Sequence, residues 1–348
     1  MRVIVDLMGG DRAPGETLRG VVAAAAENNA SYLLVGDRDE IFRIAGEIGA
    51  DLHRFDIVHA PGVVTMEDPP LSVMREKSDS SMAVGLHLLA QGQGDVFVST
   101  GNTGALFTGA TLIVRKIRGV QRAGIGTLLP TDEPCLLLDS GASVTVDAET
   151  LCQFAVMGSA YVRHLFGIQA PRVGLLNNGT EACKGTPLQR EANGRLSALP
   201  GICYAGNVEA GAVPFGACHV LVTDGFTGNV FLKCMEGTGR FLLRSVKELF
   251  AGGPLSRMSA LLVKNRAKEL KRRFDPAEHG GAPLLGISKP VVKAHGSSDA
   301  RAFRMAIRAA INYAQSDAIY EMARAVNEFD AAKRAAKAAV AGETGAKE

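Results

Sequence analysis

The sequence predicts a three-layer α/β/α fold in which helices cover both faces of a mostly parallel sheet. Short apolar runs that suit strands alternate with longer runs of helical periodicity, the pattern of βαβ units joined by right-handed crossovers. The apolar run 135–139 indicates a strand that is covered on both faces. The 40 glycines among 348 residues suit the many tight turns of such a fold.

The expected elements follow one another along the chain. Val3–Val5 predicts the first strand, and a Gly-Gly turn between two aspartates leads into a helix over 15–29. Further strands are expected at 32–35, 57–60, 135–139, 202–208 and 220–223. Three more strands are expected to begin at Val96, Arg172 and Val291. Helices are expected at 40–48, at 148–166 and from 300 to about 329. Three more helices are expected to end at 91, at about 118 and at 199. We expect one α/β domain over 1–330 and a flexible tail over 331–348.

Composition excludes several classes of protein. A net charge of +2 gives no global field for nucleic acid. Six scattered cysteines without C-x-x-C spacing indicate reduced thiols rather than disulfides or a zinc site. No apolar run approaches the ~20 residues that span a bilayer, and the start is charged too early for a signal peptide. We expect a cytoplasmic protein with no metal and no cofactor, although Asp6 and Asp11 suit either turn formation or a metal or substrate site.

Four turns share one layout, in which an apolar strand ends in Gly with Asn, Thr, Asp, Ser or His and a helix follows. The stretch Val220–Lys233 is the fullest example, and 96–107, 172–181 and 291–299 repeat it. Backbone N–H groups and the positive end of a helix dipole at such turns suit an anion, usually phosphate. The alternative is an ordinary βα turn. Because ligands bind outside the carboxyl ends of strands in open α/β sheets, we expect one shared polar crevice.

Six motifs, in order and at matching spacing, resemble the PlsX family of bacterial phosphate acyltransferases over residues 1 to about 330. They are Asp6–Asp11 (D-x-M-G-G-D), Gly101–Ala105 (G-N-T-G-A), Leu175–Gly185 (L-L-N-x-G-T-E-x-x-K-G), Gly206–Ala210 (G-N-V-E-A), Val222–Asn229 (V-T-D-G-F-T-G-N) and Lys293–Asp299 (K-A-H-G-S-S-D). Two positions depart from the family: Leu7 replaces its usual Ala, and Ser143 its common Asn.

The resemblance implies transfer of a fatty acyl group from acyl-acyl carrier protein to inorganic phosphate, which gives acyl phosphate for phospholipid (phosphatidic acid) synthesis. It implies a fold like those of phosphotransacetylases and of the isocitrate and isopropylmalate dehydrogenases. It also implies a homodimer that lies peripherally on the cytoplasmic face of an anionic membrane and meets the downstream membrane acyltransferase.

Phosphate is already largely a dianion at neutral pH, so the site needs donors that hold it in line and stabilise an oxyanion more than it needs a strong base. The expected catalytic residues are Lys184 as the cation, His295 as a hydrogen-bond donor or acid for the leaving thiolate, and Asn229. Alternatives are a solvated Lys184 and a structural His295, while an acylated Cys183 is disfavoured because no His lies near it in sequence. The expected substrate and phosphate contacts are Asn102, Thr103, Gly104, Asn178, Thr180, Glu181, Asp224, Gly225, Thr227, Gly228, Ser297 and Ser298.

An amphipathic helical hairpin is expected over about 239–275, hinged at 252–254. Seven basic residues and one acidic residue lie between Arg257 and Arg273. An apolar tip and a basic run suit docking to acidic carrier protein or to an anionic membrane, and the alternative is packing on a dimer mate. The docking residues are Leu255, Met258, Leu261, Leu262, Lys264, Arg266, Lys268, Lys271, Arg272 and Arg273.

Three other functions remain as alternatives. An NAD-dependent dehydrogenase on a related fold is disfavoured because 124–129 and 237–242 both lack the third glycine of G-x-G-x-x-G. A phosphotransacetylase-like enzyme would use the same fold. A non-catalytic membrane or carrier-protein adaptor would use the hairpin alone.

Overall fold

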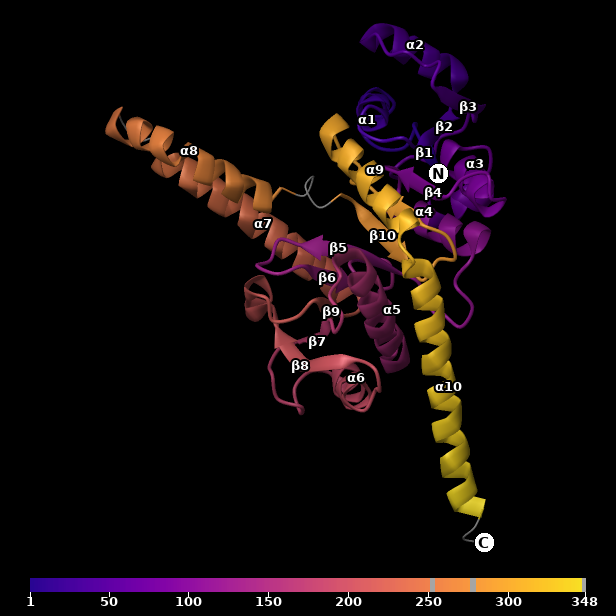
Figure 1. Ribbon diagram of the computed structural model, residues 1–348, viewed down its shortest axis with the longest axis vertical. Helices are drawn as coiled ribbons and strands as arrows, with labels where there is room; N and C mark the ends of the chain where they lie inside the picture. The colour runs from indigo at the N-terminus through magenta and orange to yellow at the C-terminus, as the bar shows by residue number, and fades with distance from the viewer. Residues whose placement is uncertain (251–253, 276–279, 346–348) are drawn as a thin grey trace.

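The computed structural model describes residues 1–250, 254–275 and 280–345, and the side chains of 254–258, 260–262 and 336–345 lie outside the description. Figure 1 shows a compact α/β body from which a pair of long helices and the C-terminal helix extend. The strands are β1 Arg2–Asp6, β2 Ser31–Gly36, β3 Phe55–His59, β4 Val96–Ser99, β5 Gly124–Leu129, β6 Cys135–Leu138, β7 Arg172–Asn177, β8 Cys203–Glu209, β9 Val220–Val222, β10 Ala282–Leu285 and β11 Val291–Lys293. The helices are α1 Gly15–Ala25, α2 Arg38–Ile48, α3 Ser81–Ala90, α4 Thr103–Gly109, α5 Ala148–Phe166, α6 Pro187–Ser197, α7 Gly225–Leu249, α8 Pro254–Arg273, α9 Ala300–Gln315 and α10 Ala318–Gly345, with short turns η1 Pro70–Met74, η2 Ala110–Val114 and η3 Ala210–Phe215.

Within the described residues the strands form one 11-stranded sheet in the order β3-β2-β1-β4-β11-β10-β5-β6-β9-β7-β8. The pairs of β10 with β11, β10 with β5 and β5 with β6 are antiparallel, and the other neighbours pair in parallel. The predicted mostly parallel sheet is therefore confirmed. The central antiparallel strands also reverse the direction of the sheet, so its two parallel halves point opposite ways.

Helices cover both faces, which confirms the three layers. One apolar cluster joins a sheet face to α1, α2, α5, α6, α9 and α10. On the other face α3 and α4 cover the half that contains β1 and β4. The apolar side chains Phe231, Leu232 and Met235 of α7 cover the half that contains β6, β7 and β9. The two parallel halves thus share one helical layer and have separate helices on the opposite face.

Local sequence signals explain where several helices begin and end. The Asp37 carboxylate caps α2 by accepting the Glu40 N–H at 3.0 Å, and Asp147 caps α5 by accepting the Thr150 N–H at 2.8 Å. Both helices end at a glycine in the left-handed conformation, Gly49 and Gly167. The bounds of α5 are those predicted from the sequence.

Other boundaries differ from the prediction. Strands β5 and β10 are not among the expected elements, because glycines and a proline interrupt their apolar patterns. The helix expected to reach about 118 ends at Val114 in a π turn. The last helix is divided at Ser316, whose backbone is extended, and α10 then continues through most of the 331–348 segment as far as Gly345.

The amphipathic hairpin is present and is longer than predicted. Its first helix, α7, begins at Gly225 directly after β9 and runs without interruption to Leu249. In Figure 1 the paired helices α7 and α8 project away from the body, toward the upper left of the view. Among the described residues, no helix is both long and apolar enough to cross a membrane.

Candidate functional site

Three polar residues stand in a row at the carboxyl ends of three neighbouring parallel strands, β1, β4 and β11. Val5 of β1 is in register with Val98 of β4, so Asp6 follows beside Ser99. Lys293 of β11 is in register with Ser99 on its other side. Because registered residues project from the same face of a sheet, an acid, a hydroxyl and an amine share one surface. This edge is where ligands bind in open α/β sheets.

Asp6 is fully buried at one end of this row. Its carboxylate accepts hydrogen bonds from the Ser81 and Ser99 hydroxyls, each at 2.6 Å, and from the N–H groups of Met8 and Gly9. Burial raises the pKa of Asp6, and these four hydrogen bonds oppose that rise. The polar partners identify Asp6 as a carboxylate that orders the turn after β1.

Lys293, at the other end of the row, is a site residue that the sequence reasoning did not select. It is 8% exposed, and its Nζ donates to the carbonyl oxygens of Thr100, at 3.1 Å, and Ala294. Burial lowers the pKa of Lys293 to about 8, against the opposing effect of Asp6 and Asp11. The available signal was a lysine ending an apolar strand, a position where a charge is rarely buried without a function.

His295 lies on the turn that follows Lys293. Its Nδ1 accepts the Ser297 N–H at 3.2 Å and lies 2.8 Å from the Ser297 hydroxyl, so we assign the proton of the neutral ring to Nε2. Burial, Lys233 and Lys293 lower its pKa, so the ring is neutral at pH 7. The ring is exposed and presents an N–H donor rather than a charge, and Ser298 beside it is buried.

Asn102, on the turn after β4, is committed to structure. Its Oδ1 caps α4 by accepting the Ala105 N–H at 3.1 Å, and its Nδ2 donates to the carbonyls of Thr65, Met66 and Asp68. The residue therefore ties the Pro-rich loop to the strand end. Of the two predicted contacts that follow, Thr103 is exposed and Gly104 is partly buried.

The predicted residues after β9 form a second group, at the start of α7. Asp224 caps the helix, and its carboxylate accepts the N–H and the hydroxyl of Thr227 at 2.8 and 2.7 Å. The Gly225 N–H donates to Ser143 O at 2.8 Å. At Gly228 an added Cβ would lie 1.9 Å from Asp139 O. Close packing against the 139–143 loop thus accounts for both glycines, and the loop accepts the first N–H group of the helix.

Asp139, which the sequence reasoning did not select either, organises that loop. The carboxylate is fully buried and accepts N–H groups from Ile125, Gly141, Ala142 and Ser143 at 2.7 to 3.1 Å. Burial raises its pKa, and the four N–H groups oppose the rise. The loop therefore has a structural role as the surface on which α7 begins.

A third group lies at the end of β7. Asn177 orders it, since its Oδ1 accepts the Asn178 N–H at 2.8 Å and its Nδ2 donates to Lys184 O at 3.3 Å. Asn178, Thr180, Glu181 and Lys184 are all exposed. Within the described part of the chain, the structure does not place Lys184 in hydrogen-bond contact with the other predicted site residues outside this loop.

The ends of these four strands do not share one edge of the sheet. Strands β4 and β11 point one way, whereas β7 and β9 point the other, because β10 and β5 reverse the sheet. Helix α7 connects the two edges. Asn229 lies beside Gly141 at one end, and one turn later Lys233 lies near enough to His295 to lower its pKa. Asn229 and Lys233 are four residues apart and so share one helix face.

The basic residues of the hairpin are exposed on α8, while its predicted apolar tip is outside the description. Lys264, Arg266, Lys268 and Lys271 are exposed, and Arg266 lies 3.4 Å from Glu269. Arg272 is also exposed, and Arg273 pairs with Asp132 of the body. The side chains of Leu255, Met258, Leu261 and Leu262 are not among those described.

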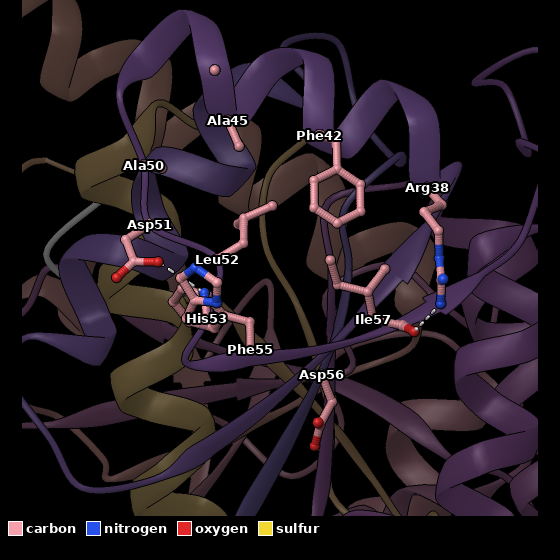
Figure 2. A pocket seen from close by; sticks show the side chains of 11 residues that line it. Arg38, Phe42, Ala45, Ala50, Asp51, Leu52, His53, Phe55, Asp56 and Ile57 are labelled. Carbon is pink, nitrogen blue, oxygen red and sulfur yellow. Dashed lines mark hydrogen bonds between the residues drawn. The ribbon is translucent and has the colours of Figure 1, made fainter.

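A surface hollow lies elsewhere on the molecule. It has a volume of about 600 Å³ and lies between α2 and the edge strand β3. Figure 2 shows Phe42 over Ile57 and the Arg38 guanidinium donating to the Ile57 carbonyl, at 3.2 Å. None of the predicted site residues lines this hollow, so it does not contribute to the candidate site.

Comparisons with known proteins find relatives over nearly the whole chain. The sequence model of a family described as "Fatty acid synthesis protein" matches residues 1–321. A phosphate acyltransferase of Thermotoga neapolitana is 46% identical over 328 residues, which cover 94% of this chain and 97% of that protein. A phosphate acyltransferase of Caldanaerobacter subterraneus subsp. tengcongensis is 40% identical, covering 92% and 95%.

Solved structures show the same fold at low sequence identity. A phosphotransacetylase from Streptococcus pyogenes superposes with a TM-score of 0.61 at 17% identity, covering 90% of this chain and 93% of that one. A 4-hydroxythreonine-4-phosphate dehydrogenase from Klebsiella pneumoniae gives 0.53 at 13% identity, covering 90% and 99%. These likenesses confirm the predicted fold relationship to phosphotransacetylases and dehydrogenases.

Proposed function

The chain belongs to the phosphate acyltransferase family, and from this premise we propose that it transfers a fatty acyl group from acyl carrier protein to inorganic phosphate. The observation that carries the proposal is the polar row at the carboxyl ends of β1, β4 and β11, with a neutral His295 above it. Acyl phosphate is the product, and its use in phosphatidic acid synthesis is part of the proposal.

The reaction suits a site built from fixed donors. A phosphate oxygen attacks the thioester carbonyl carbon, a tetrahedral oxyanion forms, and the C–S bond then breaks to release the carrier thiolate, which takes a proton from solvent. A dianionic phosphate needs no deprotonation, so catalysis rests on alignment and on stabilising the oxyanion. We propose that the Nε2–H of His295, left available because Nδ1 accepts the Ser297 N–H, donates to one of these oxygens.

Asn229 and His295 are proposed to act on the same substrate from two sides. Asn229 shares a face of α7 with Lys233, whose charge lowers the pKa of His295. A substrate along this face would extend from the His295 turn toward the 139–143 loop. The role of Lys184 as a further cation rests on its family motif, and its exposed side chain at the end of β7 leaves it free to move toward a bound substrate.

The hairpin is proposed as the docking element for the acyl donor and the membrane. Exposed lysines and arginines on α8 complement an acidic carrier protein or an anionic lipid surface. Helix α7 adds exposed apolar side chains, with Phe241 58% and Leu249 74% exposed, and such a surface favours a covering partner. We propose that a second copy of the chain covers it. The homodimer would lie peripherally on the cytoplasmic membrane face, next to the membrane acyltransferase that uses acyl phosphate.

A donor comparison tests the function. Purified protein is given phosphate with acyl carrier protein thioester, with long-chain acyl-CoA or with acetyl-CoA, and acyl phosphate is trapped as the hydroxamate. We expect the highest kcat/KM with the carrier-protein donor and no reduction of NAD. Preference for acetyl-CoA would indicate a phosphotransacetylase-like enzyme. Reduction of NAD would indicate a dehydrogenase, and no turnover with normal carrier-protein binding would indicate an adaptor.

A further inference from the structure

The Lys293 ammonium is a buried charge that lacks a counter-ion in the described part of the chain. Asp6 and Asp11 influence it electrostatically, yet no described carboxylate lies within ion-pair distance of its Nζ. Two of its three N–H groups donate to the carbonyls of Thr100 and Ala294. The third has no hydrogen-bond partner among the described residues.

A buried ammonium without an ion pair is costly, and proteins usually pair it with an opposite charge or leave it neutral. Asp6 cannot serve as that partner, because its carboxylate already accepts four hydrogen bonds from other groups. The amine therefore has one N–H without a partner among the described residues and no ion pair, although Asp6 and Asp11 attract its charge. An anion bound at this strand end would supply both an acceptor and a paired opposite charge.

We propose that the Lys293 ammonium is the buried cation that binds the phosphate substrate, with the Thr100 and Ala294 carbonyls fixing its position. The inference rests on the proposed function, because it assigns a residue to the phosphate subsite of that same reaction. The charged groups around the amine are Asp6 of β1, Asp11 of the following turn and His295 of its own turn. The two carbonyls hold the ammonium while the third N–H remains available to a phosphate oxygen.

The test compares Lys293→Met, Lys293→Arg and the control Lys289→Met with the native enzyme. Lys289 precedes the same strand and also donates to a backbone carbonyl, that of Leu89 at 2.8 Å, but it lies at the opposite end of β11. Rates of acyl phosphate formation are measured against phosphate concentration between pH 6.5 and 9.5. Phosphate binding is measured separately by calorimetry without acyl donor.

We expect Lys293→Met to lower kcat/KM for phosphate by about 10²–10³-fold and to abolish calorimetric phosphate binding, with the KM for acyl carrier protein little changed. The native rate should fall as the pH rises through about 8, where the amine loses its charge. Lys293→Arg should keep part of the activity and lose that decline, since guanidinium does not titrate in this range. Lys289→Met should resemble the native enzyme.

Two results would overturn the inference while leaving the function intact. One is a Lys293→Met enzyme that binds phosphate normally. The other is a fall in kcat alone, matched by a fall in thermal stability and with the alkaline decline unchanged, which is what a structural lysine would give. A native enzyme that makes no acyl phosphate would instead refute the proposed function, even if calorimetry showed that Lys293 binds phosphate.

Discussion

Burying the Lys293 charge should leave a measurable trace in the pH dependence of stability. Its pKa falls from 10.5 to about 8 on folding, mainly through burial. Between these values the unfolded chain binds the extra proton, so stability rises with pH. Each pKa unit corresponds to about 1.4 kcal/mol, so the whole effect on the free energy of unfolding is about 3 kcal/mol. About 2 kcal/mol of this develops between pH 7 and pH 9.5.

The measurement is urea unfolding of the native protein and of Lys293→Met at both pH values. The unfolding free energy of Lys293→Met is subtracted from that of the native protein at each pH. This removes the contributions of groups that titrate alike in both proteins, and the loss of two hydrogen bonds is the same at both pH values. The native protein should gain about 2 kcal/mol relative to the variant as the pH rises to 9.5, with equal denaturant slopes. If the difference in unfolding free energy between the two proteins stays constant across this range, folding does not lower the pKa of Lys293 and the reasoning is refuted.

Further predictions concern the other groups of the site. Gly228→Ala should cost about 1–3 kcal/mol in unfolding free energy, because the new Cβ meets Asp139 O, and unchanged stability would contradict that packing. Lys184→Ala should reduce kcat by about 10²–10³-fold in a folded protein, and near-normal kcat at saturating phosphate would exclude its role. Losses in Asn229→Ala and His295→Ala should be less than multiplicative in the double variant, whereas strict multiplicativity would separate the two sites. Leu249→Glu should convert a dimer to monomers by light scattering, and a dimer that persists would place the contact elsewhere.

A further experiment distinguishes whether the hairpin docks to a membrane or to acyl carrier protein. We expect liposome co-sedimentation that requires anionic lipid, weakens with salt and decreases when Leu255 and Leu261 become polar. If those variants sediment normally while the KM for acyl carrier protein rises, the segment binds protein and the membrane proposal is wrong.

The sequence was most informative where local signals decide the structure. Helix α5 has its predicted bounds because Asp147 and Gly167 mark its two ends. Strands β1, β2, β4 and β9 were predictable for a similar reason, since their apolar runs end in glycine-containing turns. These signals are local and need no knowledge of what lies across the sheet.

The long-range arrangement was less accessible. Strands β5 and β10 carry glycines and a proline, so their apolar patterns are weak, yet they reverse the sheet and send the ends of β7 and β9 to the opposite edge. Asp139 and Lys293 were missed because a single charged residue after an apolar run has the same local pattern as a turn former. What distinguishes them is burial, which depends on the neighbouring strands.

We propose that this chain joins a thioester acyl group to inorganic phosphate. The most direct test of this proposal is incubation with acyl carrier protein thioester and ³²P-labelled phosphate, followed by quantification of labelled acyl phosphate and free carrier thiol. We expect the two products to appear in equal amounts, at a rate proportional to the enzyme concentration. Release of thiol without labelled acyl phosphate would contradict the proposal.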